Sequence, residues 1–281
     1  MPVSGHGPVG GTGADARPRP EPEVLHRLED AVSWITLNRP HALNALTHDQ
    51  RERVIELLGT ASADPGVRAV VITATGKGFC AGADLKGSAP STDPVPGDIS
   101  RMLRLGVQRL IAAVMDCEKP VLAAVNGTAA GIGAHVAFAC DLVVAAQRAR
   151  FIEVFVRRGL VPDGGGAFLL PRLVGPQRAK ELLFFGDDLK AADAQRLGLV
   201  NAVVPDDELE ETARRWAGRL AAGPTRALAL TKRLVNDSLC VDRATAFAAE
   251  AAAQEINMGT ADAREGIRSF TERRPPHYTG R

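Results

Sequence analysis

Residues 120–133 read P-V-L-A-A-V-N-G-T-A-A-G-I-G, an apolar run that leads into a turn made of glycine and alanine. The run Val121–Val125 is typical of a strand that is buried on both faces. Small residues in a turn let a ligand approach the backbone, and the N–H groups at the start of a helix attract negative charge. The segment therefore predicts a buried strand, a turn that a ligand can reach, and a helix of small residues.

A second segment has the same layout. Ala69–Thr73 is a continuous apolar run, and F-C-A-G-A-D at residues 79–84 forms the glycine-containing turn after it. Two such turns from neighbouring strands can direct two backbone N–H groups at one oxygen atom, which is the geometry of an oxyanion hole. Each turn taken alone also fits tight packing of a strand against a helix.

The rest of the chain continues the alternation of strands and helices. Further strands are predicted at residues 32–37 and 142–146, and a T-x-x-Q capping box at Thr47 and Gln50 begins a helix. Such an alternation followed by helices alone indicates an α/β fold with a helical C-terminal region. The remaining predicted segments are a disordered tail at 1–22, a core with the active site at 23–205, a loop at 87–98, a helix at 99–117 and a helical subdomain at 206–281.

Composition argues against several classes of protein. The 281 residues carry 34 Lys and Arg against 33 Asp and Glu, and a formal charge of +1 argues against nucleic-acid binding. No apolar run approaches the roughly 18 residues that a membrane span needs. The four cysteines form no C-x-x-C pair and no zinc-like spacing with histidine, which is typical of a reduced, cytoplasmic protein. We expect a cytoplasmic globular protein with no metal site and with neither nucleic acid nor membrane as a partner.

Four motifs follow one another at intervals that span a domain. They are N-R-P and L-N-A-L within residues 38–46, F-C-A-G-A-D-L-K at 79–86, the segment at 120–133, and G-L-V-P-D-G-G-G at 159–166. Together they resemble the crotonase (enoyl-CoA hydratase/isomerase) superfamily over residues 24–281. Residues 155–175 look most like the ring-1,2-epoxyphenylacetyl-CoA isomerases of that family, and their aspartate also matches dienoyl-CoA isomerases.

The resemblance implies a ClpP-like spiral of ββα units, a C-terminal helical region that forms homotrimers or dimers of trimers, and an acyl-CoA thioester as substrate. It implies no separate cofactor, because coenzyme A is part of the substrate. It assigns two oxyanion donors, the backbone N–H groups of Ala83 and Ile132, which would stabilise the charge of a thioester enolate. Further residues implied at the substrate or at coenzyme A are Ala81, Asp84, Lys86, Gly131, Phe155, Phe270 and Arg273.

The acid and base groups depart from the hydratase pattern. Hydratases of this family use two glutamates, and the resemblance places His135 and Phe155 at those positions. Addition of water needs a base for the water and an acid for the α-carbon, and phenylalanine can be neither. Asp163 instead matches the catalytic carboxylate of isomerase members. One carboxylate with a pKa raised by burial can take a proton from one carbon and return it to another.

Several roles stay open at this point. His135 either lines the pocket as a second acid or base, or packs beneath its loop with one nitrogen on a backbone carbonyl. Glu153 is either an exposed, solvated side chain or a displaced acid. Asp84 either orders its own loop or reacts, and Phe270 either packs in the core or walls the substrate pocket.

The favoured activity is an enoyl-CoA isomerase that moves a proton through a thioester enolate, with Asp163 and His135 as catalytic residues. The first alternative is an enoyl-CoA hydratase with non-standard acid and base residues. A thioesterase, with Cys80 as a nucleophile beside His135, is a weaker alternative. The alternative from another class is a non-catalytic acyl-CoA-binding protein.

Overall fold

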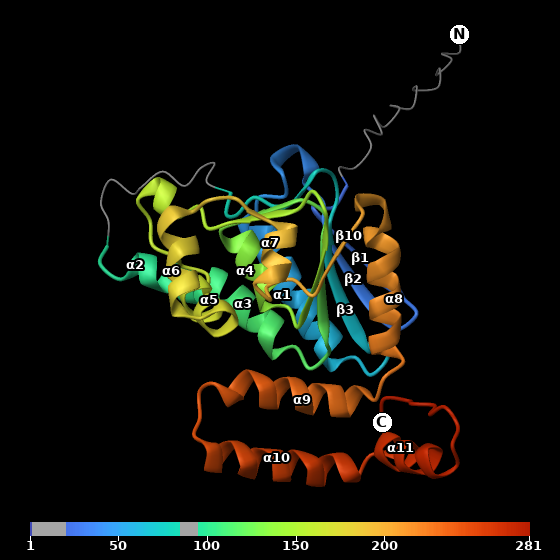
Figure 1. Ribbon diagram of the computed structural model, residues 1–281. Coiled ribbons are helices and arrows are strands. Elements are labelled where there is room, and N and C mark those ends of the chain that lie inside the picture. Colours follow the sequence, from blue (N-terminus) through green and yellow to red (C-terminus); the bar gives the residue numbers. More distant parts are fainter. Residues whose placement is uncertain (2–20, 85–94) are drawn as a thin grey trace.

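The computed structural model describes Met1, residues 21–84 and residues 95–281. Two sheets form its centre, and helices cover them (Figure 1). Three expectations concern positions outside the described residues: most of the tail predicted at 1–22, Lys86, and most of the loop predicted at 87–98.

The larger sheet has the strand order β1-β2-β3-β5-β7-β10. β1 pairs with β2 in antiparallel orientation, and the other neighbours are parallel. All four strands predicted from the sequence are confirmed, because continuous apolar runs suit strands that are covered on both faces. The strands are β1 (Val24–Glu29), β2 (Val32–Leu37), β3 (Ala69–Ala74), β5 (Val121–Val125), β7 (Leu142–Ala146) and β10 (Ala202–Val204).

The smaller sheet has the strand order β4-β6-β8-β9. We expected its first two strands to be parts of turns, since strands this short show no pattern of their own. The pairs β3–β4, β5–β6 and β7–β8 each place one strand in each sheet before helices follow, which is the expected spiral of ββα units. The strands are β4 (Gly78–Cys80), β6 (Thr128–Ala130), β8 (Arg150–Ile152) and β9 (Leu189–Lys190).

Helices cover both faces of the larger sheet (Figure 1). On one face α8 (Leu209–Ala221) buries Ala213 and Ala217 in one cluster with Trp34 and Leu122. The other face is covered by several helices, of which α1 begins at the predicted capping box of Thr47. They are α1 (His48–Ala63), α3 (Val107–Asp116), α4 (Ile132–Ala139) and, farther out, α5 (Gly166–Val174), α6 (Pro176–Phe185) and α7 (Ala191–Arg196).

The prediction of one helix over residues 99–117 is wrong. α2 (Asp98–Leu105) and α3 meet at Gly106, whose backbone leaves the helical conformation. A Cβ at Gly106 would lie 2.6 Å from the Met102 carbonyl oxygen and 3.0 Å from Nη1 of Arg51, so a larger residue has no room. The apolar spacing does not reveal this break, because it continues through both helices.

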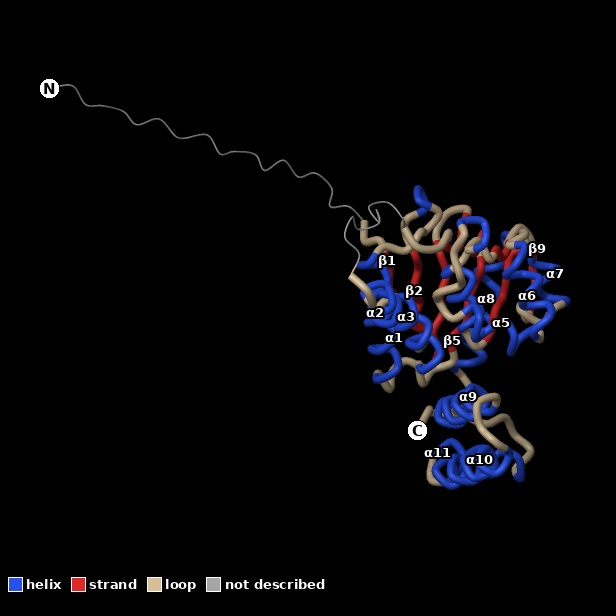
Figure 2. The backbone as a smooth tube through the Cα atoms, turned by 90° about the vertical axis from the view of Figure 1, so that its left-hand side faces the viewer, coloured by secondary structure: helices blue, strands red, loops and turns tan. Residues whose placement is uncertain are grey.

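The last three helices form a layer that extends from the body (Figures 1 and 2), as the predicted helical C-terminal region requires. They are α9 (Thr225–Ser238), α10 (Arg243–Met258) and α11 (Ala261–Thr271). No residue of α10 is buried, and large apolar side chains such as Phe247 and Ile256 face solvent. Within the described parts of the chain, no helix is long and apolar enough to cross a membrane.

Candidate active site

The turn before α4 presents one backbone donor. Gly131 has a φ of 52°, in the left-handed region that favours glycine, and its N–H donates to the carbonyl oxygen of Ile152 at 2.8 Å. Ile132 is the first residue of α4, and the first N–H groups of a helix have no partner within that helix. The N–H of Ile132 therefore points out of the start of α4.

The earlier turn presents a second backbone donor, at Ala83. Ala83 forms an isolated parallel bridge with Leu46. The Leu46 N–H donates to the Gly82 oxygen at 2.8 Å, and the Asp84 N–H donates to the Leu46 oxygen at 2.9 Å. In this pattern Leu46 bonds to the residues on either side of Ala83. The N–H of Ala83 itself points away from its bridge partner. The N–H of the exposed Ala83 is thus directed away from Leu46.

The two turns meet at one edge of the smaller sheet, because β4 and β6 are parallel neighbours. A Cβ at Gly133 would overlap the carbonyl oxygen of Cys80 and lie 2.7 Å from its Cβ. A Cβ at Gly82 would lie 3.1 Å from the carbonyl oxygen of Ala130. The glycines therefore allow the tight packing that was one interpretation of each turn. This packing brings together the two turns that carry the N–H donors.

Asp163 lies beside these turns, just before α5. The side chain of Ile132 packs beneath Gly164, where a Cβ would overlap its Cδ1, so the Asp163 turn touches the start of α4. The Asp163 carboxyl is partly buried, and burial raises its pKa above the usual 3.8, although positive charge on His135 and a backbone N–H act in the opposite direction. Gln108 donates from Nε2 to the Asp163 carbonyl oxygen at 3.3 Å. The structure therefore groups Ala83, Ile132 and Asp163.

His135 is fully buried and pairs with Glu153. Its Nε2 lies 2.9 Å from Glu153 Oε2, and the Glu153 side chain is 5% exposed. The ring packs beneath its neighbouring loop, as one interpretation held, but its nitrogen meets a carboxylate instead of a backbone carbonyl. The expectation that Glu153 is exposed and solvated is wrong, because β8 ends at Ile152 and the next residues stay inside the molecule.

Sequence reasoning missed this pair, although a signal was present. Glu153 interrupts the apolar stretch F-I-E-V-F at residues 151–155. A charged residue in such a stretch needs a partner, because burial of an unpaired charge is costly. The unusual histidine at position 135 was available as that partner.

The remaining expected residues lie at different places. Ala81 and Gly131 belong to the two turns, and Phe155 is buried with its ring stacked on His135 at a centroid distance of 5.4 Å. Asp84 Oδ2 pairs with Arg39 Nη2 at 2.9 Å, which supports its interpretation as a residue that orders its own loop.

Phe270 lies near the end of α11 and Arg273 follows that helix, in the helical layer away from α4 and α5 (Figures 1 and 2). Phe270 is 84% exposed, so the expectation that it packs in the core is wrong: α11 belongs to the outer layer and leaves this side chain in solvent. Arg273 is exposed, whereas the neighbouring Arg274 binds Glu265 at 2.6 Å and lowers the pKa of that carboxyl to about 2. The single chain does not bring these residues to Asp163.

The cysteine beside the site is poorly suited to nucleophilic attack. Cys80 is fully buried, and burial raises the pKa of its thiol to about 12. A thiol attacks as the thiolate, which a raised pKa makes scarce near neutral pH. This environment speaks against the thioesterase alternative.

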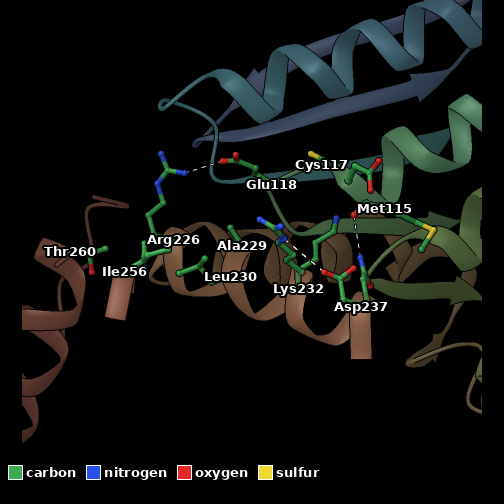
Figure 3. Close-up of a pocket in the computed structure, with 13 residues that line it drawn as sticks. Met115, Cys117, Glu118, Arg226, Ala229, Leu230, Lys232, Asp237, Ile256 and Thr260 are labelled. Carbon is green, nitrogen blue, oxygen red and sulfur yellow. Dashed lines mark hydrogen bonds and ion pairs between the residues drawn. The ribbon is translucent and has the colours of Figure 1, made fainter. Parts of the chain in front are cut away.

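A cavity of about 570 Å³ lies at a different place, between α9 and the segment after α3 (Figure 3). Glu118 and Arg226 pair across it at 2.9 Å. Lys232 also lines it and binds Asp141, the residue before β7, at 2.9 Å. None of the expected active-site residues that the structure describes lines this cavity, so the cavity is not the candidate active site.

Known proteins match the chain over most of its length. A family model described as enoyl-CoA hydratase/isomerase matches residues 27–281. A probable enoyl-CoA hydratase of Rhodobacter capsulatus is 40% identical, and the 1,2-epoxyphenylacetyl-CoA isomerase of Escherichia coli is 37% identical; each match spans 92% of this chain and 98% of the relative. The crystal structure of an enoyl-CoA hydratase from Bacillus anthracis superposes with a TM-score of 0.86 at 33% identity, over 92% of this chain and 100% of that one.

Proposed function

Because the chain belongs to the enoyl-CoA hydratase/isomerase family of acyl-CoA-processing enzymes, we propose that it is an enoyl-CoA isomerase. The substrate is an acyl-CoA thioester with a double bond or a strained ring near the thioester. The enzyme takes a proton from one carbon and returns a proton to another, and coenzyme A enters only as part of the substrate.

Asp163 is the base in this proposal. Its carboxylate removes a proton from the enolisable carbon, and the electron pair of that C–H bond moves through the conjugated system onto the thioester oxygen. The resulting enolate oxygen accepts hydrogen bonds from the N–H groups of Ala83 and Ile132, each of which is worth a factor of about 10²–10³ in rate at comparable sites. Protonated Asp163 then gives its proton to a different carbon, which restores the carboxylate without any uptake of water.

One observation carries the proposal: Asp163, with a raised pKa, sits beside the start of α4. The two positions that carry glutamate in hydratases hold His135 and Phe155, and neither presents a carboxylate. The similarity to the Escherichia coli isomerase points in the same direction. His135 assists by shaping the environment of Asp163, since its own side chain is fully buried.

Replacement of Asp163 by asparagine tests the proposal. Asparagine keeps the shape of the side chain but cannot accept the proton. We expect turnover of a 3-enoyl-CoA to fall by about 10²–10⁴-fold, the usual contribution of a general base, with acyl-CoA affinity nearly unchanged. Asp49→Asn is the matched control, since that side chain is 98% exposed, and its turnover should equal that of the wild type.

Retention of most activity by D163N would contradict the assignment of the base. A wild-type protein that binds acyl-CoA but isomerises none of the thioesters offered would instead support the non-catalytic binding protein.

An enoyl-CoA hydratase is the second candidate. It is favoured by the buried pair of His135 and Glu153, which would supply an acid and a base from a new set of residues, and by the relative of Rhodobacter capsulatus. A product that is heavier than the substrate by one water would establish this activity over the isomerase.

We also propose that the protein assembles as a homotrimer or as a dimer of trimers. Apolar side chains on the outer helices support this, with Phe247 62% and Phe270 84% exposed. A neighbouring subunit would cover them, and Arg273 would then be placed to meet the phosphates of coenzyme A, for which Lys86, outside the described residues, is the second candidate. Light scattering should give three or six times the chain mass of 29.7 kDa, and a monomer at micromolar concentration would contradict the proposal.

A further inference from the structure

Glu153 is a buried carboxylate that takes no part in the proposed proton transfer. It follows the last residue of β8, and Oε2 has one partner, Nε2 of His135 at 2.9 Å. Its other oxygen, Oε1, has no hydrogen-bond partner in the described part of the chain. Burial of a charged group is costly unless a partner compensates it, so this residue calls for a role.

The imidazole of His135 is held from several sides. A Cβ at Gly166 would overlap Nε2, and Phe155 stacks on the ring with an interplanar angle of 11°. On the opposite edge Nδ1 faces Gly164, where a Cβ would lie 3.1 Å away. The ring therefore lies between Glu153 and the turn that carries Asp163.

The hydrogen bond determines which ring nitrogen carries the proton. An ionised carboxylate only accepts hydrogen bonds, so its contact with His135 requires a proton on Nε2. Nδ1 has no partner among the described residues, and a proton there would be a buried donor without an acceptor. Of the two neutral tautomers, the arrangement thus favours the one that carries its proton on Nε2 and none on Nδ1.

We propose that Glu153 is a positioning residue: it holds His135 in the tautomer with the proton on Nε2, so that the unprotonated Nδ1 faces the turn of Asp163. This inference rests on the proposed role of Asp163 as the base. Its consequence for that base lies in the ring edge that faces the turn of Asp163, where Nδ1 presents a lone pair and no N–H. A proton on Nδ1 would direct a donor at that turn, and a donor near the carboxylate stabilises its charged form and weakens it as a base. Glu153 therefore acts on the reaction through His135 and has no contact with substrate.

The first test observes the tautomer directly in the full-length protein labelled with ¹⁵N-histidine. Ring ¹⁵N shifts distinguish a protonated from an unprotonated nitrogen, and the spectrum of His135→Asn identifies the signals of His135 by their loss. We expect protonated Nε2 and unprotonated Nδ1 in the wild type near neutral pH. Glu153→Gln, whose amide oxygen still accepts, should keep this tautomer, whereas Glu153→Met should lose it. A protonated Nδ1 in the wild type, or the same tautomer in E153M, would overturn the proposal.

The second test follows the effect on turnover. E153M should lower kcat by about 10–100-fold, by analogy with the loss seen when the partner that orients a metal-bound histidine is removed, with KM changed less than about threefold. E153Q should recover most of the loss. When E153M is added to D163N, kcat should fall by less than a further factor of about two, because the Asp163 carboxylate on which Glu153 acts is already absent. Glu56→Met, at an exposed glutamate, is the control and should leave kcat unchanged.

A purely structural role gives a different pattern. E153M would then reduce the folded fraction or the melting temperature, with an unchanged kcat per folded molecule, and this result would overturn the proposal. If E153M does not fold, the tautomer of the wild type and the kcat of E153Q still test the proposal. Because the tautomer is measured without turnover, full activity of D163N would refute the role of Asp163 separately from the Glu153 inference.

Discussion

Asp163 combines two properties that a proton-shuttling carboxylate needs. It is partly buried, which raises its pKa, and it sits on a turn that Ile132 supports from below. A base works best when its pKa approaches the pH of the reaction, so partial burial here makes an ordinary aspartate a better catalyst.

The raised pKa of Asp163 predicts a particular pH dependence. The carboxylate is the active form, so kcat/KM should fall on the acid side with a midpoint above the usual 3.8. Because the pKa is higher in the folded state than in the unfolded state, protonated Asp163 stabilises the protein below that usual value, and this stabilisation is lost as pH rises through the folded pKa. Urea unfolding of wild type and D163N should show the wild type losing stability relative to the variant across this window. A kinetic midpoint at or below 3.8 would contradict the account.

Single residues differed in how far their roles could be predicted from the sequence. The motifs that resemble the crotonase family assign Asp163, Ala83 and Ile132 to one site, so their grouping could be expected. Glu153 could not be placed, because its burial depends on where the three-residue strand β8 ends and on a partner 18 positions earlier. The outward position of Phe270 likewise depends on how the outer helices pack.

The secondary-structure elements around the site are organised by close contact between α4 and the short strands. Gly133 lets the start of α4 pack on Cys80, so a change in this contact should displace the Ile132 N–H. The long strands of the larger sheet were predictable from their apolar runs. The short strands β4, β6, β8 and β9 were not, because pairing with strands distant in the sequence creates them.

Replacement of Gly133 by alanine should therefore lower both stability and turnover. The added Cβ would overlap backbone atoms of Cys80 that cannot move aside easily, and such overpacking costs about 2–3 kcal/mol. Gly218→Ala is the matched control, since that helical glycine of α8 has open space around its Cβ position and alanine there should stabilise by about 0.5–1 kcal/mol. Chemical denaturation and kcat would be measured on both variants; equal stability of G133A and wild type would argue against the packing described.

The molecule as a whole consists of the two-sheet body and an outer layer of helices joined to it at few points. Lys232 of α9 is one such point: it binds Asp141 at 2.9 Å and donates to the carbonyl oxygens of Val114 and Lys119 at 3.1 and 3.4 Å. Arg68 is another, with bonds to Gly223 and to the C-terminal segment. These contacts orient the outer helices, whose apolar faces remain uncovered in the single chain.

Replacement of Lys232 by methionine should destabilise the protein by about 3 kcal/mol, because it leaves Asp141, whose side chain is 22% exposed, without its cationic partner. Arg233→Met is the control on the same helix, since Arg233 and its partner Asp237 are exposed and such pairs contribute less than about 1 kcal/mol. Urea unfolding would compare the two; a loss in R233M as large as that in K232M would contradict the assigned anchor.

The central claim for the whole protein is an isomerisation in which Asp163 moves a proton and no water is added. The most direct test incubates the wild type in D₂O with saturated, 2-enoyl and 3-enoyl CoA thioesters and follows each by mass and ultraviolet absorbance. We predict conversion of a 3-enoyl to a 2-enoyl thioester with no added water, and with deuterium at the newly protonated carbon to the extent that the proton on Asp163 exchanges with solvent before it is returned. A product heavier by one water would contradict this account and identify the enzyme as a hydratase.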